Sequence, residues 1–232
     1  MDNLRLNTKF IGFDGVIGRR DYLLNIAYIS IIGSLAALPV TWHLFSNLES
    51  FEKLLDIGKL YTELPSALLV WNFLALAFVS FVKISNIIRR ANDILGKTNN
   101  IINAILSILL LCGTFGLFFM PIPILAIFSV INTLISLVLF FTKGKITGKM
   151  PYDFIKDFNW GAFFGTWLWG LFNSSYKTLW MLLLGLTPAG FYYALVCGLK
   201  GNEWAYKGKK WESDEKFKKS QDIQTIIFII LK

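Results

Sequence analysis

The chain has 232 residues, of which 55% are hydrophobic and 16% charged, and its formal net charge is +8. Soluble domains are about a quarter charged, whereas this chain repeats apolar runs of the roughly 20 residues that cross a hydrocarbon core. Transmembrane barrels alternate polarity over segments of about 10 residues, a pattern the sequence lacks. We therefore expect an all-α polytopic helical membrane protein. The charge comes without the patterns of nucleic-acid readers, so nucleic acid is not an expected partner.

Five or six transmembrane helices are predicted after a turn-rich, surface-lying segment at residues 1–21. Four spans are read directly from the apolar runs: Tyr22–Leu44, Pro65–Ile84, Ile101–Met120 and Ile124–Phe141. Residues 158–199 leave two alternatives for the membrane topology. Residues 158–175 either cross as a short fifth helix before Lys177–Leu199, or form a re-entrant hairpin with it. We favour six crossings.

The orientation follows from lysine and arginine, which gather near the N-terminus, at residues 83–97 and 143–156, and in the tail after residue 199. Such residues concentrate in cytoplasmic loops of membrane proteins. Both termini are therefore predicted to be cytoplasmic. The composition divides the chain into a four-helix membrane domain at 1–142, a basic linker at 143–157, and an aromatic-rich helical hairpin with a basic cytoplasmic tail at 158–232.

A polar segment, residues 83–100, stands between the second and third predicted spans. Arg89 and Arg90 precede Asp93 by four and three residues, which places all three on one face of a helix. Residues 19–21 are expected on the same side of the membrane, giving a candidate cluster of Arg19, Arg20, Asp21, Arg89, Arg90 and Asp93. We favour a structural ion-pair cluster that fixes the helices. Lipid-headgroup binding by the arginines is a second interpretation, and a catalytic or transport role is a third.

Two glycines, Gly161 and Gly165, form a small-x-x-x-small pattern in an apolar helix. This spacing lets two helix backbones approach closely. Both residues are candidates for helix packing, and dimerisation is one form that the packing could take. Polar residues inside the predicted spans are mostly asparagines, which we expect to bond across helices.

Two stretches resemble known families. Phe10-Ile-Gly-Phe-Asp-Gly-Val-Ile-Gly-Arg-Arg-Asp-Tyr22 and Arg89-Arg-Ala-Asn-Asp-Ile94 are similar to motifs of domain of unknown function 805, the YhaH-like bacterial inner-membrane proteins. Ala91 and Asn92 replace that family's usual leucine and histidine. The resemblance covers about residues 5–145 and implies a multi-pass protein of the bacterial cytoplasmic membrane. Residues 157–211 resemble tryptophan-rich two-helix modules related to domain of unknown function 2628.

Enzyme motifs such as a nucleophile elbow, a phosphate-binding loop or HExxH are absent from the sequence. Cys112 and Cys197 lie singly in apolar runs and predict neither a disulfide nor a metal site. We expect no enzymatic activity, cofactor or metal. The favoured function is a membrane scaffold or interaction protein whose basic cytoplasmic face meets anionic lipid headgroups, a membrane protein partner or a second copy. The alternative is a small-solute channel or transporter.

Overall fold

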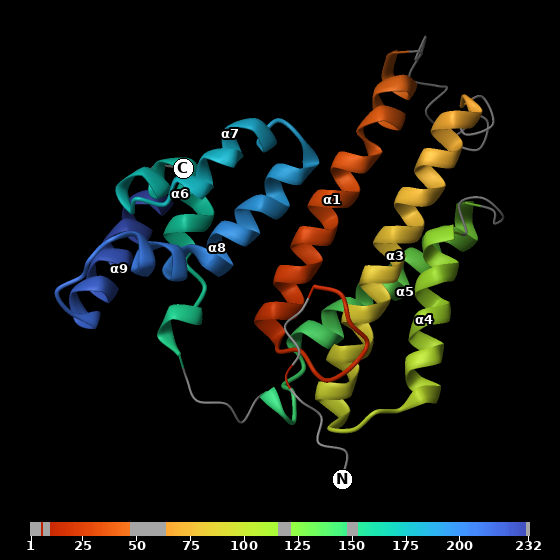
Figure 1. The fold of residues 1–232 in the computed structure, drawn as a ribbon, viewed down its shortest axis with the longest axis horizontal. Coiled ribbons are helices and arrows are strands. Elements are labelled where there is room, and N and C mark those ends of the chain that lie inside the picture. The colour runs from red at the N-terminus through yellow and green to blue at the C-terminus, as the bar shows by residue number, and fades with distance from the viewer. Residues whose placement is uncertain (1–5, 7–9, 47–63, 116–121, 148–152, 231–232) are drawn as a thin grey trace. The chain divides into compact units, whose positions relative to one another are not determined.

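The structure, a computed structural model, describes residues 6, 10–46, 64–115, 122–147 and 153–230. Within these residues the chain is all-helical, with eight α-helices, two short 3-10 helices and no strand (Figure 1). The predicted all-α class is confirmed at this level.

The chain forms two compact units, which are described separately. Unit 1 comprises Met1–Tyr22 and Ile32–Lys149, and unit 2 comprises Leu23–Ile31 and Met150–Lys232. The division after residue 149 falls inside the predicted linker 143–157. Residues 23–31 were predicted in the first domain, but Leu24 and Ala27 pack in one buried cluster with side chains of unit 2.

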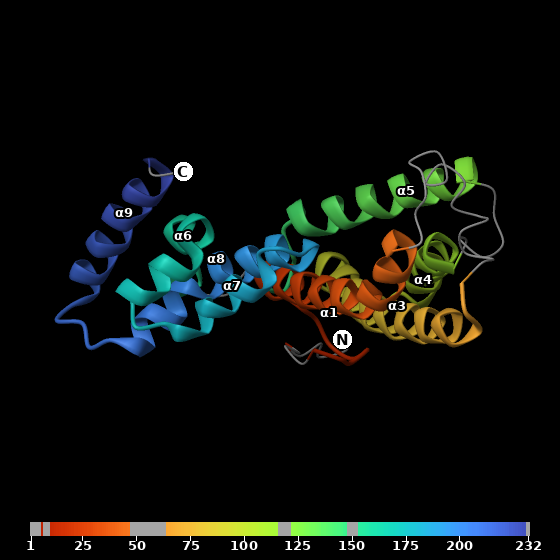
Figure 2. The same cartoon turned by 90° about the horizontal axis from the view of Figure 1, so that it is seen from above.

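The described residues of unit 1 include four helices, with α3 and α4 side by side and α5 packed on both (Figures 1 and 2). The later part of α1 lies on α3, where the Trp71 indole nitrogen donates to the Ala36 carbonyl over 2.8 Å. A Cβ atom at Gly33 would lie 3.5 Å from Val79, an ordinary packing distance. The bounds are α1 Arg19–Ser46, α3 Ser66–Leu95, α4 Asn100–Phe115 and α5 Ile122–Phe141.

Among the helices that the structure describes, two have the length and apolar composition that a membrane crossing requires. They are the 25-residue stretch Arg19–His43 of α1 and the 30 residues of α3. In the described part of the chain, Asn100–Phe115 and Ala126–Phe141 are shorter apolar helices. The structure therefore gives two candidate spans, and the count of five or six stays a prediction.

The helix that carries the second predicted span, α3, does not end with that span at Ile84. It continues through the polar segment to Leu95 and stops at Gly96, whose φ of 72° is left-handed and whose N–H bonds to the Asn92 carbonyl. No glycine or proline interrupts residues 66–95, and a left-handed glycine is a common helix end. The polar segment is thus mostly the last turns of a long helix.

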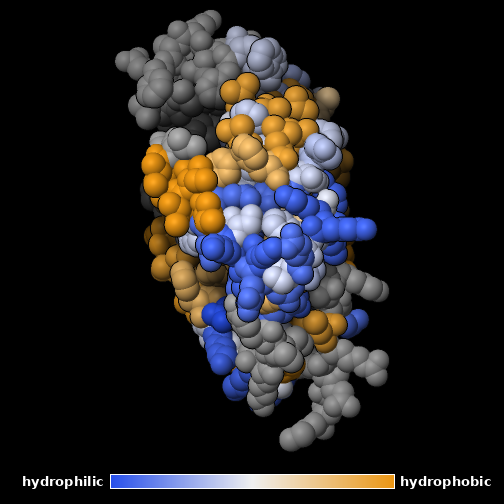
Figure 3. Space-filling model, turned by 90° about the vertical axis from the view of Figure 1, so that its left-hand side faces the viewer, coloured by the Kyte–Doolittle hydropathy of each residue, from blue (hydrophilic) through white to orange (hydrophobic). Residues whose placement is uncertain are grey.

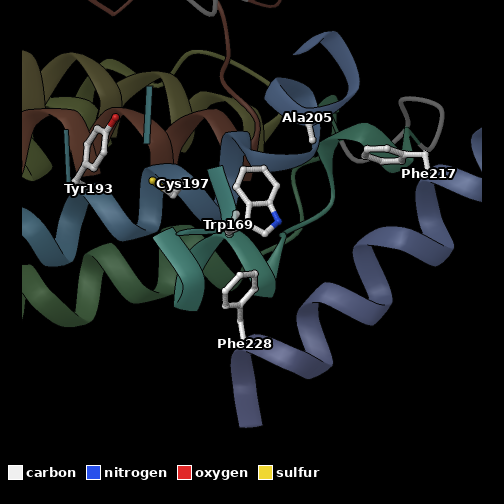
Figure 4. Packing of buried hydrophobic residues seen from close by; sticks show 7 residues of the cluster. Trp169, Tyr193, Cys197, Ala205, Phe217 and Phe228 are labelled. Carbon is white, nitrogen blue, oxygen red and sulfur yellow. The ribbon is translucent and has the colours of Figure 1, made fainter. Parts of the chain in front are cut away.

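Unit 2 packs α6 against α8 and α9 around the buried Trp169, which lies at the centre of the side chains drawn in Figure 4. The backbone of α6 leaves helical geometry at Thr166, with φ 39° and ψ −108°. The bounds are η4 Phe154–Lys156, α6 Trp160–Phe172, η5 Tyr176–Trp180, α7 Met181–Leu184, α8 Pro188–Gly208 and α9 Asp214–Ile230.

The favoured fifth and sixth crossings gain no support from these helices. The α6 helix has 13 residues, about 20 Å at 1.5 Å per residue, against a hydrocarbon core of roughly 30 Å. The 21-residue α8 carries Lys200, Glu203 and Lys207 in its second half. The run Lys177–Leu199, expected as one span, is divided between η5, α7 and α8.

Candidate functional site

The centre of the candidate site is a buried ion pair on α3. Arg90 and Asp93 are three residues apart on the same helix face, and the Arg90 Nη1 atom contacts Asp93 Oδ2 directly. Both side chains are 0% exposed. A charge in such a place is tolerated only when opposite charge and hydrogen bonds compensate its lost hydration.

The remaining donors of Arg90 join α3 to two other segments. Its Nε atom donates to the Leu139 carbonyl over 2.8 Å, and Nη2 donates to the Thr142 carbonyl. These carbonyls are at the C-terminal end of α5, where backbone acceptors lack helical partners and a cation is favourable. Nη1 also donates to the Ile17 carbonyl over 3.3 Å. One guanidinium group therefore caps α5 and holds the segment before α1.

The other side of Asp93 is covered by the residues that follow α5. Its carboxylate accepts hydrogen bonds from the Thr147 hydroxyl at 2.6 Å, the Thr147 amide at 2.9 Å and the Ile146 amide at 3.3 Å. Its backbone carbonyl accepts from the Lys145 amide at 2.9 Å. At Gly144, a Cβ atom would lie 1.9 Å from Asp93 Oδ2, so this close approach requires glycine.

These contacts change the interpretation of residues 143–147, which were predicted as the start of a linker. Their lysines and glycines are typical of an exposed connection. The structure instead folds them around Asp93, because its carboxylate supplies acceptors that satisfy the amides of residues 146 and 147. The first third of the predicted linker is part of the site.

Arg89 lies one residue earlier and makes different contacts. Its side chain is buried and donates to the carbonyls of Ser85 at 3.3 Å and Phe10 at 3.4 Å, and to the Asn86 side-chain oxygen at 3.0 Å. The Ser85 hydroxyl bonds both the amide and the carbonyl of Gly12. Arg89 and Ser85 thus fasten the segment 10–18 to α3, where the sequence suggested a surface-lying segment.

The other members of the predicted cluster lie at the start of α1. Arg20 and its neighbour Asp21 form an ion pair at 3.7 Å with partly exposed side chains, and Arg19 is the first residue of the helix. The six residues therefore make two groups in the described structure: the buried Arg90–Asp93 pair beside Arg89, and the more accessible residues 19–21.

The geometry bears on what this cluster can do chemically. Binding a lipid phosphate through Arg89 or Arg90 requires an accessible guanidinium group, and both side chains are 0% exposed with donors directed at protein oxygens. The arrangement is suited to joining α3, the end of α5 and the segment before α1. In the described residues, no group of three His, Cys, Asp or Glu side chains could hold a metal ion.

Both predicted packing glycines face α9 within the same chain. The Gly161 amide donates to the Thr225 hydroxyl over 3.2 Å. A Cβ atom at Gly165 would lie 2.7 Å from the Phe228 ring. The pattern therefore serves close approach of α6 and α9 inside unit 2.

A second polar feature, missed by the sequence reasoning, is a buried chain of side-chain amides in unit 2. Asn159 donates to Asn202 at 2.6 Å and to Gln221 at 2.9 Å. Gln221 donates to Asn173 at 2.9 Å, and Asn173 donates to Gln224 at 2.6 Å. A polar cleft of about 290 Å³ adjoins the chain and is lined in part by Asn159, Asn202 and Gln221. The available signal was Asn159, a favoured N-cap residue directly before an apolar helix.

Comparisons with protein-family models, with curated proteins and with solved structures give no match for this chain. The resemblances to the YhaH-like family and to the tryptophan-rich module stay predictions from the quoted motifs.

The last turns of α8 provide a test of the electrostatics of unit 2. Burial raises the pKa of Glu203, but hydrogen bonds from Lys200 at 2.9 Å and Lys207 at 3.1 Å outweigh this effect and bring the pKa down to about 2. An unfolded glutamate has a pKa of about 4.3. The stabilisation from Glu203 is therefore present above about pH 5 and is lost as the pH falls toward 2.

We expect Glu203→Gln to lower the free energy of unfolding by about 1 kcal/mol at pH 7, as for a partly exposed ion-pair network. The difference from the wild type should shrink as the pH falls from about 5 to 3. Denaturant unfolding of both proteins across this range measures it. A difference that is constant with pH would contradict the ion-pair account.

Proposed function

We propose that the protein is a non-enzymatic membrane scaffold or interaction protein with a basic cytoplasmic face. The observation that carries this proposal is the saturation of the buried Arg90–Asp93 pair by protein contacts from α5, from residues 146 and 147, and from Ile17. Buried ionisable residues often mark functional sites. Here they join helices, which is a structural role.

We infer that α1, α3, α4 and α5 cross the membrane and that residues 158–199 form a hairpin that does not. The four crossings are supported by α1 and α3, which are long and apolar enough to cross, and by the apolar side chains that α4 and α5 expose. The hairpin that does not cross is supported by the length of α6, which has only 13 residues. Four crossings keep both termini on one side, the cytoplasmic side by the positive-inside rule. This replaces the six crossings that the sequence favoured.

The basic face is proposed to lie on the helices of unit 2. Exposed lysines occur at the end of α8, in the turn that follows and in the first half of α9: Lys207, Lys209, Lys210, Lys216, Lys218 and Lys219. The side of the molecule on which α9 lies shows a broad hydrophilic area bordered by hydrophobic patches (Figure 3). The second half of α9 exposes isoleucines. Lysines beside exposed apolar residues suit an anionic membrane surface, and also a membrane protein partner or a second copy.

One observation favours the alternative of a small-solute channel. On α3, the Asn72 side-chain nitrogen and the Ser80 hydroxyl are buried and have no hydrogen-bond partner in the described structure. Buried polar groups without partners call for an explanation, such as water or a passing solute.

A flux measurement separates the two functions. We expect proteoliposomes containing the protein to release K⁺ and glycerol no faster than liposomes without it. Solute movement that depends on the protein, and that falls in Asn72→Leu, would overturn the scaffold proposal. Crosslinking with mass spectrometry in native membranes should in turn recover a membrane protein partner or a second copy.

A further inference from the structure

A groove in unit 1 lies outside the ion-pair cluster. It has a volume of about 380 Å³ and is lined only by apolar side chains of α3, α4 and α5. The lining residues are Ala91, Ile94, Leu95, Ile102, Leu106, Ile131, Leu134, Ile135, Val138 and Leu139. A groove of this size with apolar walls on three helices can hold a flexible hydrocarbon chain.

The groove is at one end of these helices. Its walls come from the last turns of α3, the first turns of α4 and the second half of α5. Residues 131–139 of α5 span about 12 Å, close to the depth of one leaflet, roughly 15 Å. The orientation given under the proposed function places this end at the cytoplasmic surface, and the inference rests on it.

Two basic residues are near the wall residue Leu95 at that end: Lys145 through a hydrogen bond, and Lys97 two positions later in the sequence. Lys97 and Lys145 are exposed, and the Lys145 Nζ atom donates to the carbonyl of Leu95, a wall residue, over 3.2 Å. Residues 94–152 contain no aspartate or glutamate, and Asp93 is paired with Arg90. A lysine ammonium group has three donors, so Lys145 keeps donors for a further acceptor.

We propose that the groove binds one acyl chain of an anionic phospholipid from the cytoplasmic leaflet, with the lipid phosphate against Lys97 and Lys145. Apolar walls alone would accept any phospholipid. The two lysines, with no exposed carboxylate in the neighbouring sequence, favour a net negative headgroup over a zwitterionic one.

The experiment uses the full chain in detergent, to which phosphatidylglycerol or phosphatidylcholine with the same acyl chains is added. Native mass spectrometry measures lipid retained per protein. We expect the wild type to retain phosphatidylglycerol about tenfold more than phosphatidylcholine, and Lys97→Gln/Lys145→Gln to remove this preference. Leu134→Trp, which fills the groove, should lower retention of both lipids. Lys97→Arg/Lys145→Arg keeps the charge and should keep the preference.

The matched control is Lys156→Gln/Lys177→Gln, which removes the same charge at two exposed lysines of unit 2 outside the basic face and should leave the preference unchanged. Equal retention of the two lipids by the wild type would overturn the proposal. So would a control variant that loses the preference as fully as Lys97→Gln/Lys145→Gln. This result is separable from the flux result. A lipid preference without flux supports both proposals. Flux with an intact preference overturns only the scaffold function. The absence of both flux and preference overturns only the lipid site.

Discussion

Replacing Asp93 with alanine should lower the free energy of unfolding by about 3–5 kcal/mol, because it leaves the buried Arg90 guanidinium group without its opposite charge. The variant also loses the acceptor for the Thr147 hydroxyl and for two backbone amides. Denaturant unfolding in detergent, followed by the circular dichroism of the helices, measures the change. The α5 end and residues 143–147 should become the most exchangeable part of unit 1 in hydrogen exchange.

Asp21→Ala is the matched control for this experiment. Asp21 also pairs with an arginine, but at 3.7 Å and with a side chain that is 30% exposed, so its loss should cost about 1 kcal/mol or less. The double variant Arg90→Met/Asp93→Leu should recover part of the lost stability, since it removes both buried charges together. An unfolding midpoint of Asp93→Ala equal to that of the wild type would rule out the structural role of the pair.

Gly165→Ala should destabilise unit 2 by about 1–3 kcal/mol, the usual cost of overpacking. The added methyl group would be 2.7 Å from the Phe228 ring, so α6 and α9 must separate or the ring must move. The loss outweighs the gain in helix propensity, which is about 1 kcal/mol. Thermal unfolding in detergent and protease sensitivity of α9 are the measurements.

Gly33→Ala controls for the glycine substitution itself. Its methyl group would contact Val79 at 3.5 Å without overlap, so stability should stay the same or rise. In a double-mutant cycle, Phe228→Ala should make Gly165→Ala less costly, because it removes the ring that the methyl group meets. A Gly165→Ala protein with unchanged monomer stability but a weakened dimer would contradict packing within the chain.

The helical class, α1 and α3 could be predicted from the sequence because long apolar runs carry strong signals. The environment of Asp93 could not. Apart from Arg90, its hydrogen-bond partners are at residues 145–147, some 50 positions later. The glycine and lysines of residues 143–147 are locally typical of a linker. Helical spacing correctly placed Arg90 and Asp93 on one face, but spacing says nothing about which of two adjacent arginines the carboxylate meets.

In unit 2 the sequence signals indicated helix packing and an apolar run, but not the packing partner or the helix bounds. The Gly161–Gly165 pattern indicates close helix approach, but not whether the partner is α9 or a second chain. The apolar run 177–199 is long enough for a span, yet it breaks into η5, α7 and α8. The α8 helix begins at Pro188, a residue favoured at the first helical position. The short η5 and α7 segments pack on α6, and hydropathy does not record such packing.

The amide chain of unit 2 has a direction. Asn159 accepts from the backbone amide of Ala162 at 2.7 Å, which fixes its oxygen, so its nitrogen must face Gln221. Gln221 then donates onward to Asn173, and Asn173 to Gln224. Rotating Asn159, Gln221 or Asn173 by 180° would oppose like atoms on both sides, whereas Gln224 ends the row at the Ser220 hydroxyl, which can donate or accept. The Ala162 amide at the start of α6 and the Trp169 indole N–H, which donates to Gln221 at 3.2 Å, therefore set the polarity of a row that ends in the middle of α9.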